Sequence, residues 1–374
     1  MFYIKRKITI MRVGIDAHML GDHSGGNESY YYNILLNMVI PEGDLYYIFV
    51  KKGTDKLLLD SRFIIVEFKE QNAFKRNFLE LPQLCKKYKL DVLHTQYFIP
   101  FIRFCPVVCT IHDICFEHYK DIFTTKEYIR QKLLIPYAAK HARYIFTVSN
   151  HAKRDIHEHY NIPLDRIIVT YNAVGDEFRR LSQDELKSDC LRKKYNIKND
   201  FILSVGNLQP RKNLVRLIRV FKRLKQCDIY TGQLVIVGKK AWMYNDILKE
   251  ALDDVNDVIF TDYVSKEDLI RLYNDAEIFV YPSFFEGFGI PPLEALACGT
   301  AVAVANTTSL PEVVGDAGVY FNPFDEDNMF DSISKLINDA DIKKNILARA
   351  EYEVEKFSWK ISAEKIIDCY GKFK

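Results

Sequence analysis

The sequence predicts an α/β fold with two doubly wound parallel sheets in tandem. Short apolar runs rich in Val and Ile alternate with longer stretches of helical periodicity, as expected for strands buried on both faces. The alternation stops at the polar stretch 191–200 and starts again after it. A chain of 374 residues is long enough for two hydrophobic cores. We therefore expect two domains, with a boundary near residues 185–200.

Seven strands are expected in the first winding, which begins with "MRVGID" at Met11. They are 11–16, 45–50, 63–68, 91–95, 106–113, 144–149 and 166–172. We expect the ten residues before Met11 to form an extension outside the fold. Six strands are expected in the second winding: 201–206, 233–238, 258–264, 277–283, 300–306 and 318–323. Ligands of such sheets bind at the carboxyl ends of the strands, so the residues that follow each run are the informative ones.

Composition excludes some classes of protein and favours a globular enzyme. A formal net charge of +2 gives no reason to expect nucleic acid as a partner. The eight cysteines show no CxxC pair and no zinc-type spacing, which favours reduced thiols of a cytoplasmic protein. No run approaches the roughly 20 apolar residues that span a bilayer, and "MFYIKRKITI" lacks the features of a signal peptide. We expect a cytoplasmic location.

The second domain opens with "SVGNLQPRKNLVRLIRVFKRLK", a strand, a turn at Gly206–Asn207 and a helix. We expect Arg211 and Lys212 at the start of that helix, where cations oppose the helix dipole unless an anion binds there. A bound diphosphate is a physical reason for such a pair. An exposed basic turn without a ligand is the alternative.

A second informative stretch reads "YPSFFEGFGIPPLEALACGTAVAVAN". Glu286 is expected on a loop in which Gly287 and Gly289 permit close approach of a ligand, and Glu294 in the first turn of the following helix. As carboxylates, the two residues can accept hydrogen bonds from the hydroxyls of a ribose and a sugar. Glu294 can instead stabilise the helix start, or the pair can be the acid and nucleophile of a glycosidase.

The first domain contributes a glycine loop and a histidine. In "VGIDAHMLGDHSGGNESYYYNILLNM", Gly25 and Gly26 precede Asn27, which we expect to be the helix N-cap. His112 follows a buried strand and is expected to reach the ligand crevice, although a structural histidine is the alternative. The loop is not GxGxxG, which disfavours an ordinary Rossmann dehydrogenase.

Two other motifs resemble metal sites. "HEHY" (157–160) has no third ligand at a sensible distance, so a solvated helix face is the better interpretation. "DED" (325–327) is expected to cap a helix rather than to bind a metal ion.

Taken together, the motifs resemble the retaining glycosyltransferases of the two-Rossmann (GT-B) type, specifically family four. The strongest match is "EGFGIPPLEALACGTAVAVANTTSLPEVVGDAGVYFNP", and "SVGNLQPRKN", "TIHD", "TVSNHAKRDI" and "SGGNESYYYNIL" support it in the same order. One departure is "NAVGDEF" (172–178), where relatives usually read Asn-Gly-Val-Asp. The resemblance implies two Rossmann-like domains facing a central cleft. These are an acceptor-binding domain at 1–190 and a nucleotide-sugar-binding domain at 191–355, with a last helix at 356–374 that crosses back to the first domain.

The resemblance also implies a role for each matching residue. The catalytic group is His112, Arg211, Lys212 and Glu286, with the basic pair on the donor diphosphate and Glu286 on the transferred sugar. Glu294 matches the residue that binds the ribose, while Tyr263 and Val264 lie where a nucleobase pocket is expected. The other donor-binding positions belong to glycine loops: Gly25, Gly26, Gly206, Asn207, Gly287, Phe288 and Gly289.

Within the family the motifs look most like bacterial mannosyltransferases that extend O-antigen or other surface polysaccharides. This implies transfer of a hexose, expected to be mannose from GDP-mannose, to a saccharide hydroxyl with retention and without a protein base. No metal ion and no other cofactor are expected. The alternatives are a UDP-sugar donor (glucose, GlcNAc or galactose), a sugar-nucleotide epimerase, and a non-catalytic nucleotide-sugar-binding subunit.

The acceptor in such pathways is often lipid-linked, which makes peripheral contact with the cytoplasmic face of a membrane an expectation. The basic and apolar segments 73–89 and 126–143 are the candidate surfaces. Ordinary amphipathic helices packed on the sheet are the alternative.

Overall fold

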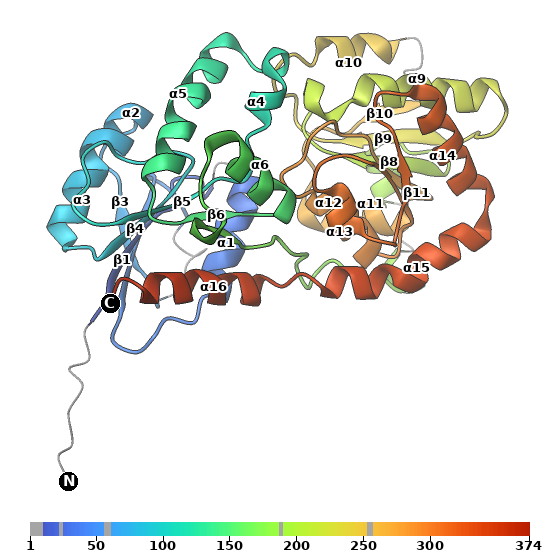
Figure 1. The fold of residues 1–374 in the computed structure, drawn as a ribbon. Helices are drawn as coiled ribbons and strands as arrows, with labels where there is room; N and C mark the ends of the chain where they lie inside the picture. Colours follow the sequence, from blue (N-terminus) through green and yellow to red (C-terminus); the bar gives the residue numbers. More distant parts are fainter. Residues whose placement is uncertain (1–9, 22–24, 56–60, 187–189, 253–256) are drawn as a thin grey trace. The chain divides into compact units, whose positions relative to one another are not determined.

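The computed structural model describes residues 10–374 except 22–24, 56–60, 187–189 and 253–256 (Figure 1). The expected N-terminal extension therefore lies outside the described residues, apart from Ile10. Contacts between residues divide the chain into two compact units. Unit 1 comprises the residues up to Ile114 together with Lys126–Asn172 and Trp359–Lys374, and unit 2 comprises Cys115–Thr125 and Ala173–Ser358.

Unit 1 is built on a seven-stranded parallel sheet in the order β3-β2-β1-β4-β5-β6-β7. Its strands are β1 (Arg12–Asp16), β2 (Leu45–Val50), β3 (Ile64–Glu67), β4 (Val92–Gln96), β5 (Val107–Thr110), β6 (Ile145–Thr147) and β7 (Ile167–Val169). Its helices are α1 (Gly26–Asn37), α2 (Ala73–Lys75), the π-helical turn η2 (Arg76–Glu80), α3 (Leu81–Tyr88), α5 (Thr125–His141), α6 (Asn150–Tyr160), η4 (Leu164–Arg166) and α16 (Trp359–Gly371). The helices cover both faces of the sheet (Figure 1).

Unit 2 has a six-stranded parallel sheet in the order β10-β9-β8-β11-β12-β13. Its strands are β8 (Phe201–Val205), β9 (Gln233–Val237), β10 (Val258–Phe260), β11 (Ile278–Tyr281), β12 (Val302–Ala305) and β13 (Val319–Phe321). Its helices and turns are α4 (Cys115–His118), η3 (Lys120–Ile122), α7 (Gln183–Leu186), α8 (Cys190–Lys194), η5 (Pro210–Lys212), α9 (Leu214–Gln226), α10 (Asn245–Glu250), α11 (Lys266–Asp275), α12 (Ile290–Ala297), α13 (Leu310–Val314), α14 (Glu326–Asn338) and α15 (Ala340–Glu355).

Both expected windings are confirmed, because each apolar run identified in the sequence coincides with one of the strands to within a few residues. The runs are buried on both faces: every residue of β4, β5, β9, β11 and β12 is buried. The expected apolar face of the helix after β8 is also confirmed, since Leu214, Leu217, Ile218, Phe221 and Leu224 are all buried.

The change of unit falls at residues 172 and 173, before the expected domain boundary at 190 and 191. The segment after Asn172 is bound to helix α11 of unit 2. The Leu181 N–H donates to Asn274 Oδ1 at 2.8 Å, and Asn274 Nδ2 donates to the Arg179 carbonyl at 3.0 Å. Hydrogen bonds between backbone and side chain, which a polarity pattern does not reveal, thus assign this segment to unit 2.

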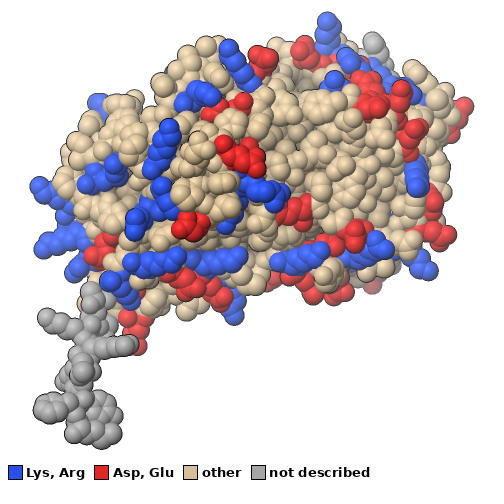
Figure 2. Space-filling model, in the orientation of Figure 1, with Lys and Arg blue, Asp and Glu red and all other residues tan. Residues whose placement is uncertain are grey.

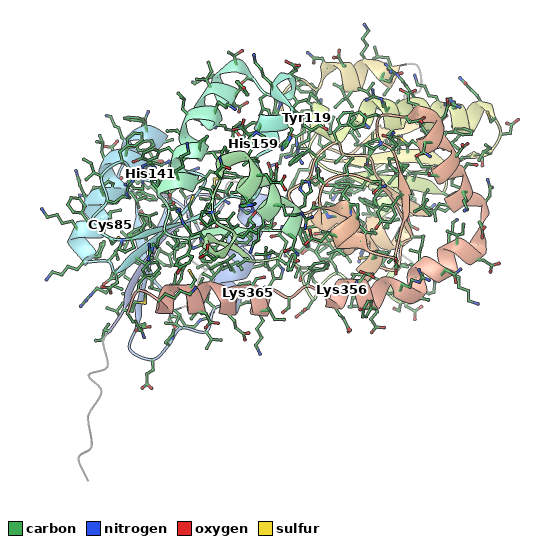
Figure 3. The ribbon with its side chains drawn as sticks, viewed as in Figure 1. Cys85, Tyr119, His141, His159, Lys356 and Lys365 are labelled. Atoms are coloured by element: carbon green, nitrogen blue, oxygen red, sulfur yellow. The ribbon has the colours of Figure 1, made fainter. Side chains whose placement is uncertain are left out.

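The last helix, α16, packs in unit 1 although it follows unit 2 in the chain. Its Ser362 hydroxyl donates to the Tyr171 carbonyl at 2.7 Å, and Lys365, labelled in Figure 3, donates to the Val169 carbonyl at 3.1 Å. Tyr370 is buried and its hydroxyl lies 2.6 Å from His94 Nδ1. No helix within the described parts of the chain combines the length and apolarity needed to cross a membrane.

Candidate active site

In unit 2 the strand order reverses between β8 and β11, two neighbouring strands that are far apart in the sequence. The loops that leave their carboxyl ends are therefore adjacent, as the rule for doubly wound sheets requires of a ligand site. A backbone hydrogen bond joins them, from the Phe284 N–H to the Arg211 carbonyl at 3.0 Å. Asn213, buried at the start of α9, adds a side-chain bond to the Pro282 carbonyl at 3.1 Å.

Lys212 is buried in this junction. Its Nζ donates to the Tyr281 hydroxyl and to Glu286 Oε1, both at 2.6 Å, and lies 4.6 Å from the centroid of the Tyr281 ring. Gly206 makes room for it: a Cβ on Gly206 would lie 3.0 Å from Lys212 Cε and 3.2 Å from Cδ. The glycine at the end of β8 is therefore needed for the lysine to lie in the junction.

Arg211 binds the other oxygen of the same carboxylate, with NH1 2.7 Å from Glu286 Oε2, and also donates to the Phe285 carbonyl at 2.5 Å. Burial of Glu286 opposes its ionisation, but the charges of Arg211 and Lys212 outweigh burial and lower its pKa to about 2. The glutamate is ionised at neutral pH, so the three side chains carry a net charge of +1. The Arg211–Lys212–Glu286 cluster is thus a cationic centre in which Lys212 and Glu286 are buried and Arg211 is half-buried.

Hydroxyls from the loop after β12 hold the backbone around Glu286. Thr308 Oγ1 accepts from the Glu286 N–H at 3.0 Å, and the single proton of the Ser309 hydroxyl lies within reach of the carbonyls of Glu286 (2.9 Å) and Phe288 (2.8 Å). At Gly289 the chain adopts a φ of 97°, and a Cβ there would lie 2.6 Å from Leu310 Cδ2, so the expected need for glycine is confirmed at this position. Sequence reasoning missed Tyr281, Thr308 and Ser309, because nothing in a single sequence pairs them with Glu286.

A short segment before α5 also packs on this loop within unit 2. The His118 ring stacks on Phe285 with centroids 5.3 Å apart, and Tyr119, labelled in Figure 3, stacks on Phe284 at 6.3 Å. Residues 115–125 were expected in the first domain, but they belong to unit 2. Aromatic contacts with the loop that carries Glu286 are part of the reason.

Arg211 and Lys212 were expected at the start of helix α9. They instead form the 3₁₀ turn η5 just before it. Asn213 follows in the left-handed conformation with φ of 55° and separates the turn from α9. The two cations therefore lie outside the first turn of α9. Both cations form ion pairs with the carboxylate of Glu286. The argument that an anion must offset the helix dipole at this pair was therefore wrong, although the pair itself was correctly singled out.

Glu294 was expected in the first turn of α12, but it is the fifth residue of that helix, which starts at Ile290 after the Gly289 N-cap. The helix begins earlier because Pro291 can occupy its first turn without a donor N–H. Glu294 therefore does not cap the backbone N–H groups. Its Oε2 accepts from the buried hydroxyl of Tyr273 at 2.8 Å. Burial raises the pKa of Glu294 to about 7, against the effect of this hydrogen bond.

The remaining unit 2 positions from the sequence lie in the loops around these groups. Asn207 follows Gly206 at the end of β8, and Gly287 and Phe288 lie between Glu286 and the start of α12, where both are buried. Tyr263 and Val264 follow β10; Val264 is buried, whereas Tyr263 is exposed with its ring 4.7 Å from Lys239 Nζ. Tyr263 and Val264 thus lie after a strand two places from β8 in the sheet.

In unit 1, His112 is buried after β5, and its Nε2 lies 2.6 Å from Gln96 Nε2, so the Gln96 amide donates and the ring proton is on Nδ1. Burial lowers the pKa of His112 to about 3, which keeps it neutral. Gly25, with φ of 78°, is the N-cap of α1 and Gly26 is its first residue. Asn27 is therefore not the N-cap; a left-handed glycine starts the helix without a side-chain cap.

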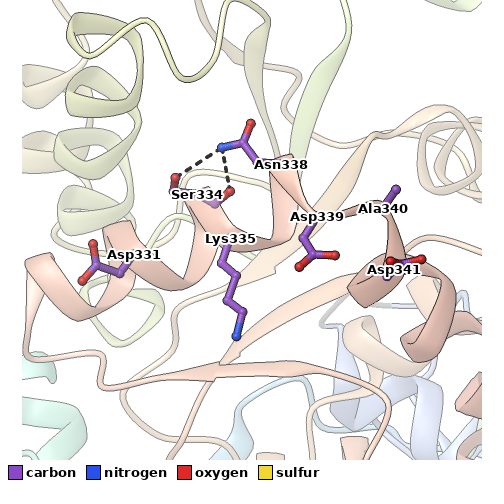
Figure 4. Close-up of a pocket in the computed structure, with 7 residues that line it drawn as sticks. All are labelled: Asp331, Ser334, Lys335, Asn338, Asp339, Ala340 and Asp341. Atoms are coloured by element: carbon purple, nitrogen blue, oxygen red, sulfur yellow. Dashed lines mark hydrogen bonds between the residues drawn. The ribbon is translucent and has the colours of Figure 1, made fainter.

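Each of the two metal-like motifs contains a residue with a structural role. Asp325 caps α14 by accepting from the N–H groups of Asp327 and Asn328, both at 3.0 Å, as expected. His157 Nδ1 lies 2.8 Å from the Ile162 carbonyl at the end of α6. A shallow open depression at the junction of α14 and α15 contains none of the candidate site residues (Figure 4). Its polar groups serve the helices: Asn338 donates to Ser334, and Asp339 caps α15.

Two doubly wound parallel-sheet domains in one chain define the GT-B fold class. The description "Glycosyltransferase Family 4" matches residues 42–178, and "Glycosyl transferases group 1" matches residues 188–353. O-antigen chain mannosyltransferase B of Escherichia coli is 33% identical over 298 residues, which cover 76% of this chain and 75% of that protein. The chain therefore belongs to glycosyltransferase family 4.

Two further relatives extend the comparison. The serotype-specific mannosyltransferase WbdA of Escherichia coli is 33% identical over 274 residues, covering 71% of this chain. This chain spans about a third of the length of WbdA, since the match covers 33% of it. The crystal structure of Anabaena Alr3699/HepE in complex with UDP and glucose has the same fold, with a TM-score of 0.74, 19% identity, and coverage of 97% of this chain and 100% of that one.

Proposed function

We propose that the protein transfers mannose from GDP-mannose to a saccharide hydroxyl, with retention of the anomeric configuration, in the synthesis of O-antigen or a related surface polysaccharide. The observation that carries this proposal is the buried Arg211–Lys212–Glu286 cluster at the switch point of unit 2. The names of the two mannosyltransferase relatives support the sugar and the pathway. The UDP and glucose in the HepE complex support a nucleotide-sugar donor.

The chemistry of this proposal requires that charge on the departing diphosphate be stabilised as its bond to the sugar breaks. Arg211 and Lys212 supply two fixed cations for it, and their net charge remains positive after Glu286 is counted. Because the cluster is already assembled, little reorganisation is needed when charge develops. The departing phosphate takes the proton of the acceptor hydroxyl in this mechanism, so no protein base is assigned.

Each sequence-predicted residue keeps its proposed role. Glu286 accepts hydrogen bonds from the transferred sugar, which is compatible with its two ion pairs because each carboxylate oxygen has two lone pairs. Glu294 binds the ribose. Neutral His112 hydrogen-bonds a substrate oxygen from the carboxyl end of β5 rather than acting as a cationic acid. We propose that the reaction needs no metal ion, because the cationic pair has the role that a divalent cation has in other transferases.

The test is a thermal-shift panel of GDP, UDP, ADP and their sugars, followed by transfer to a saccharide acceptor. We expect GDP and GDP-mannose to raise the unfolding temperature by mass action, and the product to keep the donor's anomeric configuration. EDTA should leave the rate unchanged. If UDP stabilised the protein selectively, the donor would be a UDP-sugar and not GDP-mannose.

The alternatives differ in what they do with donor and acceptor. An epimerase would change the donor sugar with no acceptor present, and a non-catalytic subunit would bind the donor without turnover. Hydrolysis of aryl glycosides that is insensitive to nucleoside diphosphates would establish a glycosidase. Any of these results would overturn transfer as the function.

We also propose that unit 1 contacts the cytoplasmic face of a membrane that carries a lipid-linked acceptor. The two basic segments expected from the sequence meet at the loop 97–106: the Phe78 ring stacks on Phe101 at 4.5 Å, and Phe101 lies 5.1 Å from Tyr137 on α5. Large apolar side chains remain exposed over these three segments: Phe74, Leu79, Phe101, Ile102, Phe104, Ile129 and Leu133. The alternative of packed amphipathic helices explains the buried faces of α3 (Leu81, Leu84 and Cys85) and α5 (Ile135, Ala138 and Ala139), but not these exposed side chains.

Charge favours an anionic lipid surface over a protein partner. The segments 73–89, 97–106 and 126–143 contain eleven Lys and Arg residues and two Glu residues, against a net charge of only +2 for the whole chain. Figure 2 shows Lys and Arg side chains spread over the helices α3 and α5. Exposed aromatic and aliphatic groups beside lysines are the composition of an interfacial membrane contact.

Vesicle co-sedimentation tests this contact. The protein should bind phosphatidylcholine vesicles that contain phosphatidylglycerol, less at high salt, and the variant Ile102→Ser/Phe104→Ser/Lys86→Glu/Lys87→Glu should not. Val39→Ser, which removes an exposed apolar side chain outside these segments, is the matched control. Equal binding by the quadruple variant, or no binding of wild type to these vesicles, would overturn the contact.

A further inference from the structure

Tyr273 is a buried residue of α11 whose hydroxyl points to the site. It is 0% exposed, and its OH donates to Glu294 Oε2 at 2.8 Å. Its ring packs edge-on against Phe178 at 6.1 Å and lies 5.6 Å from Phe279. The Thr300 hydroxyl donates to the Tyr273 carbonyl. Packing and hydrogen bonds therefore fix the position from which the phenol reaches Glu294.

The direction of the hydrogen bond is set by burial. Burial raises the pKa of Tyr273 well above its usual value, so the phenol keeps its proton and can only donate to a carboxylate. The bond engages Oε2 and leaves the lone pairs of Oε1 to accept from other donors. A hydroxyl-bearing ligand can thus be held by a carboxylate whose orientation is already determined.

The other charged groups that act on the pKa of Glu294 oppose one another. Glu177 raises its pKa, Lys266 lowers it, and these two residues form an ion pair of 2.7 Å with each other. Cys298, the C-cap of the helix that carries Glu294, keeps its proton because burial and the nearby carboxylate both raise the pKa of its thiol. Tyr273 is therefore the partner on which the ionised form of Glu294 most depends.

We propose that Tyr273 is a positioning residue that holds Glu294 as an oriented carboxylate for the ribose of the donor, and that this pair sets the pH range in which the donor binds. The inference rests on the proposed function, in which Glu294 binds the ribose. The inference assigns a role to Tyr273, which lies outside the motif that contains the two glutamates. It also makes donor binding at this site depend on pH.

The sign of the pH effect follows from the two forms of Glu294. The carboxylate accepts hydrogen bonds from both ribose hydroxyls, whereas the acid form has lost part of that capacity. Nucleotide affinity should therefore fall as pH falls below about 7, where Glu294 takes up a proton. Removal of the phenol proton removes a bond to the charged form, so Tyr273→Phe should move the midpoint to higher pH by about one unit.

Calorimetric titration with GDP, or with the nucleoside diphosphate that the thermal-shift panel selects, tests this from about pH 5.5 to 9. We expect wild type to bind more tightly above the midpoint, Tyr273→Phe to bind about fivefold more weakly near pH 7, and Glu294→Gln to lose the pH dependence. Tyr320→Phe is the control, because it also removes a hydroxyl with a hydrogen bond, here a half-buried one that donates to the Gly315 carbonyl. In turnover, Tyr273→Phe should raise the donor KM and leave kcat at high pH unchanged.

The outcomes separate this inference from the proposed function. If no nucleotide binds wild type, the proposed function fails. If wild type binds a nucleotide but its affinity does not change with pH, or if Tyr273→Phe keeps the wild-type midpoint, the role of Tyr273 fails while the function stands. If Tyr273→Phe does not fold, the dependence of wild-type nucleotide affinity on pH decides the pH claim by itself.

Discussion

Glu286 and Glu294 lie eight residues apart, one on a loop and the other on the helix that follows it. The pKa values of their carboxyl groups are shifted in opposite directions. Two cations, Arg211 and Lys212, surround Glu286 and lower its pKa to about 2, although burial opposes this. Burial raises the pKa of Glu294 to about 7, and the hydrogen-bond donor to this carboxyl group is the phenol of Tyr273. The same residue type is therefore a permanent anion at one position and a titrating group at the other. The groups that the fold places beside each glutamate decide which of the two behaviours it shows.

The largest expected effect comes from removing the charge of Glu286. Glu286→Gln leaves the buried cation of Lys212 and the half-buried one of Arg211 without their counter-ion, and loss of one partner of a buried pair costs about 3–5 kcal/mol of unfolding free energy. Denaturant titration measures it. Glu326→Gln is the control, because Glu326 also lies near two arginines, Arg216 at 3.8 Å and Arg219 at 3.5 Å, but on the surface. It should cost less than about 1 kcal/mol; equal costs would contradict the buried cluster.

The second effect concerns turnover. Lys212→Met removes one fixed cation and leaves Glu286 paired with Arg211, so we expect kcat to fall on the order of 10²–10³-fold, as for other lost transition-state donors. Steady-state kinetics with donor and acceptor provide the measurement. Lys225→Met, which removes a 2.9 Å ion pair with Asp257 elsewhere in unit 2, should leave kcat unchanged. A Lys212→Met enzyme with wild-type kcat would remove Lys212 from the catalytic group.

The third effect tests how closely the Glu286 site is packed. Gly206→Ala places a Cβ about 3 Å from the Lys212 side chain and should cost roughly 1–3 kcal/mol of unfolding free energy, with a loss of activity as the lysine shifts. Gly371→Ala is matched to it, because a Cβ there meets nothing within 4 Å. Should both variants keep wild-type activity and stability, Gly206 would have no role in placing Lys212.

The smallest effect separates the two glutamates by pH. Stability from Glu286 is present above its ordinary pKa of 4.5 and is lost as pH falls from 4.5 to about 2. For Glu294 the folded protein holds the proton more tightly, so its contribution is full below 4.5 and is lost as pH rises towards about 7. Glu294→Gln should thus gain about 1–2 kcal/mol relative to wild type between pH 5 and 7. A constant difference in unfolding free energy across that range would contradict the raised pKa.

The strands and most of the site residues could be predicted because their signals are local. Runs of Val and Ile specify buried strands wherever they occur, and Gly289 and Gly206 mark turns that other residues do not fit. Arg211, Lys212, Glu286 and Glu294 were singled out because unusual charge follows buried strands. The helix starts were less predictable: Gly25 rather than Asn27 begins α1, and α12 begins four residues before Glu294.

The sequence by itself determined two parallel α/β domains, the glycine turns and the polar residues at the ends of the strands, because each depends on neighbours within a few positions. Only the tertiary structure decided that Lys212 meets Glu286, that Tyr273 meets Glu294, and that residues 115–125 and 173–186 belong to unit 2. These contacts join residues 21 to 167 positions apart, and they arise from the adjacency of β8 and β11, from packing on α11 and from aromatic contacts with the loop that carries Glu286. The physical reason is that ionisation and hydrogen bonding depend on distance in space, which a linear pattern of residue types does not contain.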